Sequence, residues 1–276
     1  MSIKYAYLGP VGTFTEAALQ KIATASDQII AFANVTAALD AVRDGQCQKA
    51  LVPIENSVEG VVARTLDELA IGDPLVITAE TTLPVSFSLM TLTKTNPAEI
   101  KSIATHPHAE SQCRSFIAKN YPNAQVIESS STAAAAKGLS NGDYDAAIAG
   151  SNAAKNYNLK IIAENIGDNA GAITRFVLVE KPGNQPKATG KDRTSLAVFI
   201  AVDHAGALLE ILNEFAKHQV NLTFIQSRPT GSQLGHYHFI IDAEGHIEDK
   251  PISAALAGLK EICEDIRFLG SYPQAK

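Results

Sequence analysis

The sequence predicts an α/β fold of two lobes followed by a small domain of ferredoxin-like βαββαβ order. The chain has 276 residues, too many for one ordinary core and suited to two domains. Short apolar runs typical of strands alternate with amphipathic helical stretches over the first two-thirds of the chain. A segment rich in Pro, Gly and Lys (KPGNQPKATGKDR, 181–193) then interrupts the pattern.

The strands predicted before this linker cover residues 4–8, 28–32, 49–53, 75–79, 85–92, 102–105, 125–128, 146–149, 160–163 and 173–180. Helices are predicted between them at 16–25, 36–44, 109–120 and 132–139. The alternation predicts largely parallel sheets. One open sheet of this many strands would be large, so two α/β lobes that enclose a cleft are the better prediction. A ligand is then expected beyond the carboxyl ends of the strands.

The pattern after the linker predicts one strand, a helix, two strands, a helix and a last strand. The strand at 194–202 places alternate apolar residues on one face: Leu196, Val198, Ile200 and Val202. The following helix carries one apolar stripe: Leu208, Ile211, Leu212 and Phe215. Strands at 221–227 and 235–242, a helix opening at Pro251 and a strand near 266–270 complete the ferredoxin-like order.

Composition excludes several classes of function. The net charge is −6 without a basic cluster, so no nucleic-acid partner is expected. No apolar run is long enough to span a bilayer, and residues 1–8 lack the pattern of a signal peptide. Three scattered cysteines indicate reduced thiols in a cytoplasmic protein. His106 and His108 have no further ligands at zinc-like spacing, so no metal site is expected.

Two predicted helix starts carry groups that can hold an anion. The segment 9–16 (GPVGTFTE) joins a strand to a helix, and its glycines let backbone amides approach a ligand. An ordinary capped turn, with Thr15 as the cap, explains the same residues. The segment Ser129-Ser130-Ser131-Thr132 precedes an alanine-rich helix, where capping is again the commoner use of hydroxyl groups.

Two strand ends gather other polar groups. Residues 53–60 (PIENSVEG) offer an amide, a hydroxyl and carboxylates where the backbone leaves a sheet. A solvated turn capped by Asn or Ser explains them equally well. Residues 165–172 form a loop before Thr174 and Arg175, which supply a hydroxyl donor and a guanidinium fork suited to a carboxylate.

Taken together and in this order, these segments resemble the prephenate dehydratase family. The matching pieces are GPVGTFTEAA at 9–18, PIENSVEG at 53–60, HPHAESQC at 106–113, STAAAA at 131–136 and TRF at 174–176. The last domain resembles the ACT domain attached to that enzyme, through GALLEIL at 206–212, NLTFIQSRP at 221–229 and LGSYP at 269–273. The resemblance runs over nearly the whole chain.

The resemblance implies a two-lobed catalytic domain of the type II periplasmic-binding-protein kind at 1–181. Its lobes are 1–80 with 165–181, and 81–164; a linker at 182–193 and an ACT domain at 194–276 follow. It further implies conversion of prephenate to phenylpyruvate, CO2 and water in phenylalanine biosynthesis, without a cofactor. No chorismate mutase helices precede residue 4, so a single activity is expected.

The family's essential threonine maps onto Thr174, which we expect to donate a hydrogen bond to the leaving oxygen. The resemblance and the residue chemistry together predict a substrate-binding set: Arg175, Phe176, Thr13, Asn56, Ser57 and Thr132. Of these, Arg175 and the helix-start hydroxyls of Thr13 and Thr132 are the candidates for holding carboxylates. The family often has Asn where this chain has Ala172, a departure that leaves Thr174 and Arg175 in place.

The ACT domain implies phenylalanine as an inhibitory effector, bound between two such domains of a dimer or tetramer. The predicted effector site comprises Gly206, Ala207, Leu208, Gln226, Ser227, Arg228 and Pro229. Two departures touch it, because the family commonly has Glu at the position of Gln226 and Pro at that of Ala205. A neutral amide in direct contact with the effector ammonium would weaken binding by about ten- to a hundred-fold.

Two other functions fit the same features. An arogenate dehydratase performs the same elimination on a substrate with an amine, and the sequence contains no discriminating residue. A non-catalytic ligand sensor with two lobes and an ACT domain belongs to a different class. Turnover of prephenate and of arogenate separates the three.

Overall fold

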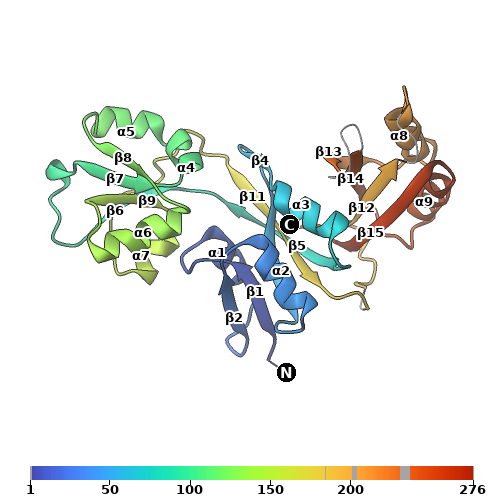
Figure 1. Ribbon diagram of the computed structural model, residues 1–276, viewed down its shortest axis with the longest axis horizontal. Helices are drawn as coiled ribbons and strands as arrows, with labels where there is room; N and C mark the ends of the chain where they lie inside the picture. The colour runs from blue at the N-terminus through green and yellow to red at the C-terminus, as the bar shows by residue number, and fades with distance from the viewer. Residues whose placement is uncertain (1, 184, 201–203, 231–236, 276) are drawn as a thin grey trace. The chain divides into compact units, whose positions relative to one another are not determined.

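The computed structural model describes residues 2–183, 185–200, 204–230 and 237–275. Within these ranges the strands form three sheets, drawn in Figure 1. No helix among the described residues is long and apolar enough to cross a membrane. The order of elements confirms the α/β fold predicted from the sequence, with a βαββαβ unit at its end.

The first sheet has the strand order β2-β1-β3-β11-β5, with β4 paired to β3. Its strands are β1 (Lys4–Leu8), β2 (Gln28–Phe32), β3 (Lys49–Asn56), β4 (Gly60–Val61), β5 (Val76–Pro84) and β11 (Ile173–Glu180). The helices α1 (Phe14–Leu19), α2 (Val35–Arg43) and α3 (Ala63–Ile71) come from the same part of the chain. Because β3 continues three residues beyond the predicted end at residue 53, Asn56 belongs to the strand.

Two predicted elements of this region differ from the structure. Helix α1 ends at Leu19 and not at residue 25. Beyond it, the backbone N–H and the hydroxyl of Thr24 both donate to the Asp27 carboxylate, a local bonding pattern that competes with a helix. Helix α3 was not predicted, although it occupies nine residues that follow β4.

The second sheet has the order β10-β6-β9-β7-β8. Its elements are β6 (Ser88–Thr91), β7 (Ser102–Thr105), α4 (Pro107–Gln112), α5 (Arg114–Asn120), β8 (Gln125–Glu128), α6 (Thr132–Asn141), β9 (Ala146–Ala149), α7 (Ser151–Asn156) and β10 (Lys160–Ala163), with a 3₁₀ turn η1 at Pro97–Glu99. Strand β7 is parallel to β8 and β9, whereas β6 is antiparallel to β9 and β10. The prediction of largely parallel sheets is therefore wrong for this edge.

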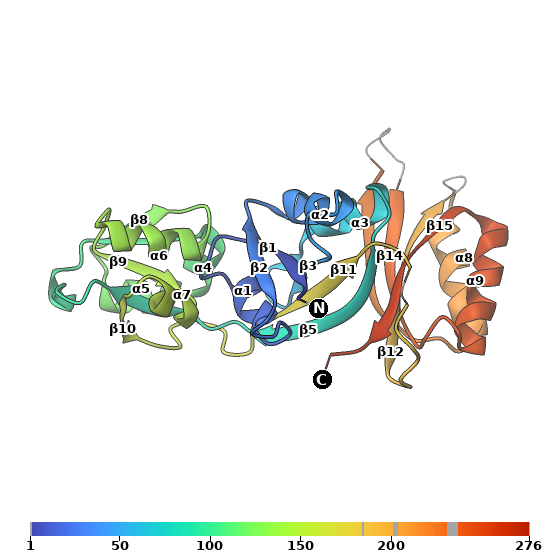
Figure 2. The same ribbon diagram turned by 90° about the horizontal axis from the view of Figure 1, so that it is seen from below.

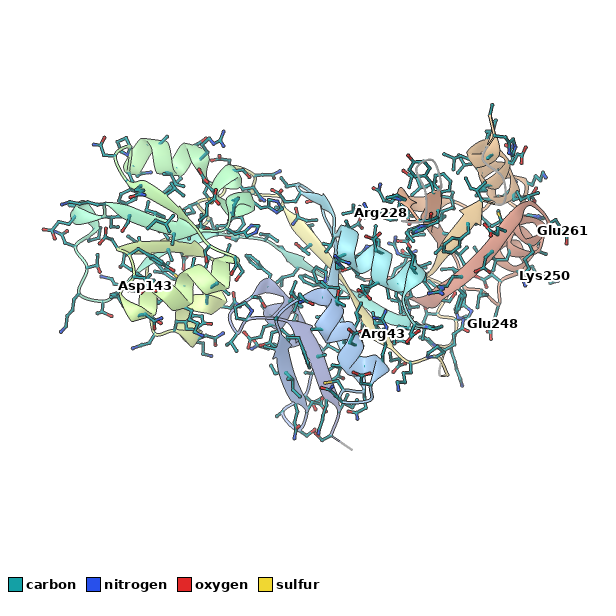
Figure 3. The ribbon with its side chains drawn as sticks, viewed as in Figure 1. Arg43, Asp143, Arg228, Glu248, Lys250 and Glu261 are labelled. Carbon is teal, nitrogen blue, oxygen red and sulfur yellow. The ribbon has the colours of Figure 1, made fainter. Side chains whose placement is uncertain are left out.

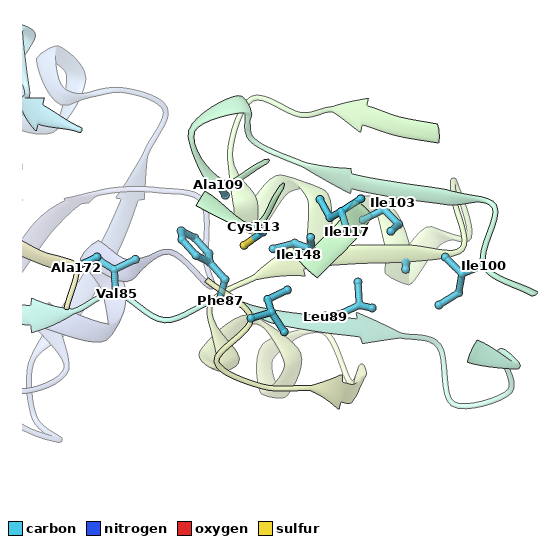
Figure 4. Close-up of a cluster of buried hydrophobic side chains, with 12 residues drawn as sticks. Val85, Phe87, Leu89, Ile100, Ile103, Ala109, Cys113, Ile117, Ile148 and Ala172 are labelled. Atoms are coloured by element: carbon cyan, nitrogen blue, oxygen red, sulfur yellow. The ribbon is translucent and has the colours of Figure 1, made fainter. Parts of the chain in front are cut away.

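One core of the second sheet lies between its strands and α4 and α5, as Figure 4 shows for Phe87, Leu89, Ile103, Cys113 and Ile148. The predicted helix at 109–120 is in fact two helices, because the backbone leaves the helical region at Cys113 (φ −121°, ψ 12°). The Cys113 side chain is buried, and desolvation raises its pKa to about 12. Cys113 is therefore a packing residue of this core.

The third sheet is antiparallel, with the order β13-β14-β12-β15. Its elements are β12 (Asp192–Ile200), α8 (Ala207–Lys217), β13 (Leu222–Pro229), β14 (Tyr237–Glu244), α9 (Lys250–Ile262) and β15 (Cys263–Pro273). Figure 2 shows α8 and α9 together on one face of the sheet, where Ile211, Phe215 and Leu259 are buried. Leu208, predicted in the same stripe, is instead exposed at the first turn of α8. Val202 and Gly235 lie outside the described residues.

Packing divides the chain into two compact units. The first comprises Met1–Ala38, Leu51–Val61 and Thr82–Phe176, and the second comprises Leu39–Ala50, Val62–Thr81 and Val177–Lys276. The residues around Thr174 lie in the first unit. Helix α3 and the first part of β5 group with the third sheet in the second unit.

Candidate active site

Thr174 and Asn56 form a hydrogen-bonded pair between the start of β11 and the end of β3. The Asn56 Nδ2 donates to the Thr174 Oγ1 over 2.8 Å. The Asn56 Oδ1 accepts the backbone N–H groups of Val58 and Glu59, each over 2.9 Å. These two donors require an oxygen, so the orientation of the Asn56 amide is fixed. The Thr174 oxygen is therefore the acceptor, and its own proton is directed elsewhere.

Arg175 and Glu55 pair on the opposite face of the same two strands. Successive side chains of a strand point to opposite faces, so Arg175 cannot share a face with Thr174. The Arg175 Nε lies 2.7 Å from the Glu55 Oε1, and the arginine side chain is 6% exposed against 34% for the glutamate. The N–H is not aligned with that oxygen, so the contact is an ion pair. The guanidinium predicted to hold a substrate carboxylate thus already faces a carboxylate of the protein.

Ser57 joins the two strands directly beside the Asn56–Thr174 pair. Its backbone N–H donates to the Ile173 carbonyl oxygen, and its Oγ accepts the Ile173 N–H, both over 2.9 Å. The Ser57 hydroxyl proton remains available to another acceptor. Phe176, on the same face of β11 as Thr174, is 1% exposed and belongs to the core.

The segment before α1 is a variant of the capping box, in which the Glu16 carboxylate accepts the N–H of Gly12 and not that of the N-cap residue. Thr13, and not Thr15, is the N-cap: its Oγ1 accepts the Glu16 N–H over 3.3 Å and donates to the Leu8 carbonyl oxygen. The buried Glu16 carboxylate accepts from the Gly12 N–H over 2.6 Å and from the Asn156 Nδ2 over 3.0 Å. Both functions of the Thr13 hydroxyl are therefore used within the protein.

The Glu16 carboxylate also affects its neighbours. Desolvation and this carboxylate raise the pKa of the buried Tyr7. Gly12 adopts φ +91°, and a Cβ there would lie 3.1 Å from the Tyr157 ring. Glycine is thus required at this position by backbone conformation and by close approach.

The start of α6 is capped by Ser131, whose Oγ accepts the Ala134 N–H over 2.9 Å. Thr132 follows as the first helical residue. Among the described residues, no hydrogen bond joins Thr132 or Thr13 to the Asn56–Thr174 pair. Hydrogen bonds of the described residues therefore connect Asn56, Ser57 and Thr174 and do not extend to the two helix-start threonines.

Glu59 and Gln112 form a further polar contact, which the sequence did not predict. The Gln112 Nε2 donates to the Glu59 Oε1 over 2.7 Å, and Gln112 is 8% exposed. The Glu59 Oε2 lies 3.6 Å from the Nδ1 of the exposed His108. Both residues belong to the quoted motifs, but a separation of 53 positions gave no signal that they meet.

His106 and His108 lie at the start of α4, where the His106 Nδ1 accepts the His108 N–H over 3.2 Å. Desolvation, together with His108, lowers the pKa of His106. Within the part of the chain that the structure describes, no group of three His, Cys, Asp or Glu side chains could hold a metal ion. The His106 ring thus acts as a helix cap.

The residues of the predicted effector site lie on two elements of the βαββαβ unit, the start of α8 and strand β13, and those on β13 point to opposite faces. Gly206 is the N-cap of α8 with φ +101°, and Ala207 begins the helix. Along β13, Ser227 and Pro229 are exposed, whereas Gln226 and Arg228 are partly buried on the other face. The Arg228 Nε and Nη2 donate to the two oxygens of Asp67 on α3, over 2.8 and 2.7 Å; Figure 3 labels this arginine.

Comparisons with known proteins agree with this arrangement. The prephenate dehydratase family profile matches residues 5–184, and the ACT domain profile matches residues 194–261. A prephenate dehydratase of Amycolatopsis methanolica is 45% identical over 273 residues, which are 99% of this chain and 89% of that protein.

Two solved structures superpose over 98% of this chain. A prephenate dehydratase of Arthrobacter aurescens in complex with L-Phe has a TM-score of 0.93 at 48% identity, with 90% of its chain covered. A quorum quenching acylase has a TM-score of 0.86 at 27% identity, with 98% covered. The fold is therefore shared by different activities, and the side chains must identify the chemistry.

Proposed function

The chain belongs to the prephenate dehydratase family and is a carbon–oxygen lyase with prephenate as its substrate, and from this premise we propose that Thr174 assists the departure of the substrate hydroxyl. The hydrogen bond from Asn56 to the Thr174 oxygen carries this proposal. An oxygen that accepts from a fixed amide directs its own proton away from that amide. The proton is then available to the leaving oxygen.

The reaction makes modest demands on the protein. The ring carboxylate leaves as CO2, and the electron pair of the broken C–C bond moves into the ring. The C–O bond breaks in turn, the hydroxyl takes up a proton and leaves as water, and an aromatic ring results. The electrons flow to the leaving oxygen, so no other electron acceptor is needed. Positioning of the dianion and donation to the leaving oxygen each contribute orders of magnitude to the rate.

The remaining substrate-binding assignments differ in their support. Ser57 adjoins the Asn56–Thr174 pair and retains a proton to donate, so we include it with Asn56 in the site. Arg175 also binds Glu55, so we propose that it holds the end of β3 against β11 in addition to any substrate contact. Thr13 and Thr132 remain candidates for carboxylate binding through their helix starts, and Phe176 for the packing beneath the site.

The test of the activity is direct. The purified chain is incubated with prephenate or with arogenate, and formation of phenylpyruvate or phenylalanine is followed after treatment with EDTA and without it. We expect turnover of prephenate at the same rate in both conditions. Preference for arogenate would reassign the substrate, and absence of turnover with either would favour a ligand sensor. A loss of rate restored by one metal ion would contradict the cofactor-free chemistry.

We propose that phenylalanine inhibits the enzyme from a site between the ACT domains of a dimer or tetramer. The relative from Arthrobacter aurescens was solved with L-Phe, which supports phenylalanine as the effector. On this chain, Leu208, Leu209 and Ile225 are exposed near the two predicted effector segments. Such apolar groups favour a contact with a second copy, which can close a pocket around an aromatic ring. No disulfide joins Cys47, Cys113 or Cys263 among the described residues, which fits a reducing cytoplasm.

A further inference from the structure

The Asn56–Thr174 pair is carried by two chain segments, and both are anchored to one residue of α4. The first segment is the turn after β3. There the Asn56 Oδ1 accepts the N–H groups of Val58 and Glu59, and the Glu59 carboxylate continues the chain of bonds to the Gln112 side chain.

The second segment is the loop 165–172, which leads into β11 and so delivers Thr174. Its Asp168 N–H donates to the backbone carbonyl oxygen of Gln112. The Asp168 Oδ2 accepts the Ser115 N–H over 3.2 Å, which attaches the same loop to the start of α5. Gln112 thus holds the first segment through its side chain and the second through its backbone.

These contacts close a ring: Thr174, Asn56, the turn to Glu59, Gln112, Asp168 and the loop back to Thr174. A closed ring fixes the distance between its members better than the same bonds in an open chain, because each segment is held at both ends. One link of this ring is the bond between the carboxylate of Glu59, an exposed residue, and Gln112. The other end of that link, the Gln112 amide, is nearly buried, so the loss of its partner is unfavourable.

We propose that Glu59 is a positioning residue of the lyase reaction. It acts without contact to a reacting atom. It holds the turn that orients the Asn56 amide, and through that amide the Thr174 hydroxyl. The inference rests on the proposed function, since it assigns Glu59 to the same site.

The role needs an acceptor oxygen at the position of the Glu59 Oε1 and does not need its charge. Glu59→Gln keeps an acceptor oxygen at the same reach, whereas Glu59→Ala removes it. We expect Glu59→Ala to lower kcat about ten- to a hundred-fold with KM within about threefold, because small misplacements of reacting groups have effects of this size. Glu59→Gln should retain kcat within about threefold.

Glu110→Ala is the matched control. It removes a carboxylate from α4, two residues before Gln112. Side chains two residues apart on a helix point in different directions, so Glu110 does not take part in the Glu59–Gln112 contact. It should leave kcat within about twofold. If the negative charge of Glu59 mattered instead, through His108 or the substrate, Glu59→Gln would behave like Glu59→Ala and the proposal would be wrong.

A double-mutant cycle tests the ring itself. If Glu59 acts through Gln112, the kcat of Glu59→Ala/Gln112→Ala should equal that of Gln112→Ala within about threefold. Multiplicative losses would contradict the proposal. Thermal unfolding and substrate affinity of each variant distinguish misplacement of the Thr174 hydroxyl from misfolding of the protein. Glu59→Gln should fold as the wild type does. If the wild-type protein did not turn over prephenate, the proposed lyase function itself would be refuted. If the wild type is active and Glu59→Ala is equally active, only the role of Glu59 is refuted.

Discussion

The two regions that carry family motifs use their side chains differently. At the junction of β3 and β11, Asn56, Ser57 and Thr174 contact one another or the partner strand within one small volume. In the third sheet, the alternation along β13 sends Ser227 and Pro229 to one face and Gln226 and Arg228 to the other. Side chains from the ends of two neighbouring strands can therefore contact one ligand together, whereas successive side chains along a single strand point to two opposite faces of the sheet.

The second face of β13 is engaged with α3. The fork of Arg228 on Asp67 is bidentate, and Arg267 of β15 donates to the Gly72 carbonyl oxygen at the end of the same helix. Helix α3 begins two residues after β4, whose Gly60 and Val61 pair with Asn56 and Glu55. A movement of β13 that displaces Arg228 thus has a covalent route to the residues beside Thr174. We expect Arg228 to couple effector binding to the site, in addition to any contact with the effector.

The largest effect is expected from Asn56→Asp at the junction of β3 and β11. A carboxylate can still accept from the Val58 and Glu59 N–H groups, but its second oxygen would accept the Thr174 proton and direct it away from the substrate. We expect kcat to fall about a hundredfold. The control is Asn34→Asp at the start of α2, where Asn34 accepts the Ala37 N–H and Asp caps equally well. Steady-state rates of both variants with prephenate decide; wild-type turnover in Asn56→Asp would reject the assigned amide orientation.

The contact between β13 and α3 is tested by Asp67→Asn, which removes the negative charge that the Arg228 guanidinium binds. Basal turnover should stay within about twofold, whereas inhibition at saturating phenylalanine should become incomplete, because the coupling is lost and the binding is not. Calorimetry should show nearly unchanged phenylalanine affinity. Asp73→Asn, an exposed change just past α3, should alter neither quantity. Intact inhibition in Asp67→Asn would remove Arg228 from the coupling.

The smallest effect is expected from Gln226→Glu. The Gln226 Nε2 donates to the carbonyl oxygen of the adjacent Ser227, so the side chain supports its own strand. We therefore expect calorimetric titration to give a phenylalanine affinity within about threefold of wild type. Binding tightened by ten- to a hundred-fold would instead establish a direct contact with the effector ammonium. Absence of binding in both proteins would end the regulatory proposal.

Local pattern predicted much of the fold. Strands such as Lys4–Leu8, Ser102–Thr105 and Ile173–Glu180 have the predicted bounds, because short apolar runs end at turn residues on both sides. Helix α7, with its small and polar residues Ser151–Asn156, had too little apolar periodicity to be predicted. The break at Cys113 was missed for the opposite reason, since the apolar stripe continues across it.

The candidate site was predictable as a set of motifs and not as a set of contacts. Thr174, Asn56 and Ser57 were identified from the quoted segments, and the structure brings them together. The capping of α1 by Thr13 follows from the local spacing TFTE, so the sequence contained that signal. The pairs Glu55–Arg175, Glu59–Gln112 and Asp67–Arg228 depend on strand and helix packing between distant segments, which periodicity does not encode.

The role of the Thr174 hydroxyl is decided by comparing kcat for prephenate in Thr174→Ser and Thr174→Val. Serine retains an oxygen that can accept from Asn56 and a proton to donate, whereas valine keeps the shape and removes both. We predict that Thr174→Ser keeps kcat within about tenfold of wild type. Thr174→Val, like Thr174→Ala, should lose about a hundred- to a thousand-fold while remaining folded and still binding substrate. Equal kcat in the serine and valine variants, or near-wild-type turnover by Thr174→Val, would contradict the role assigned to this hydroxyl.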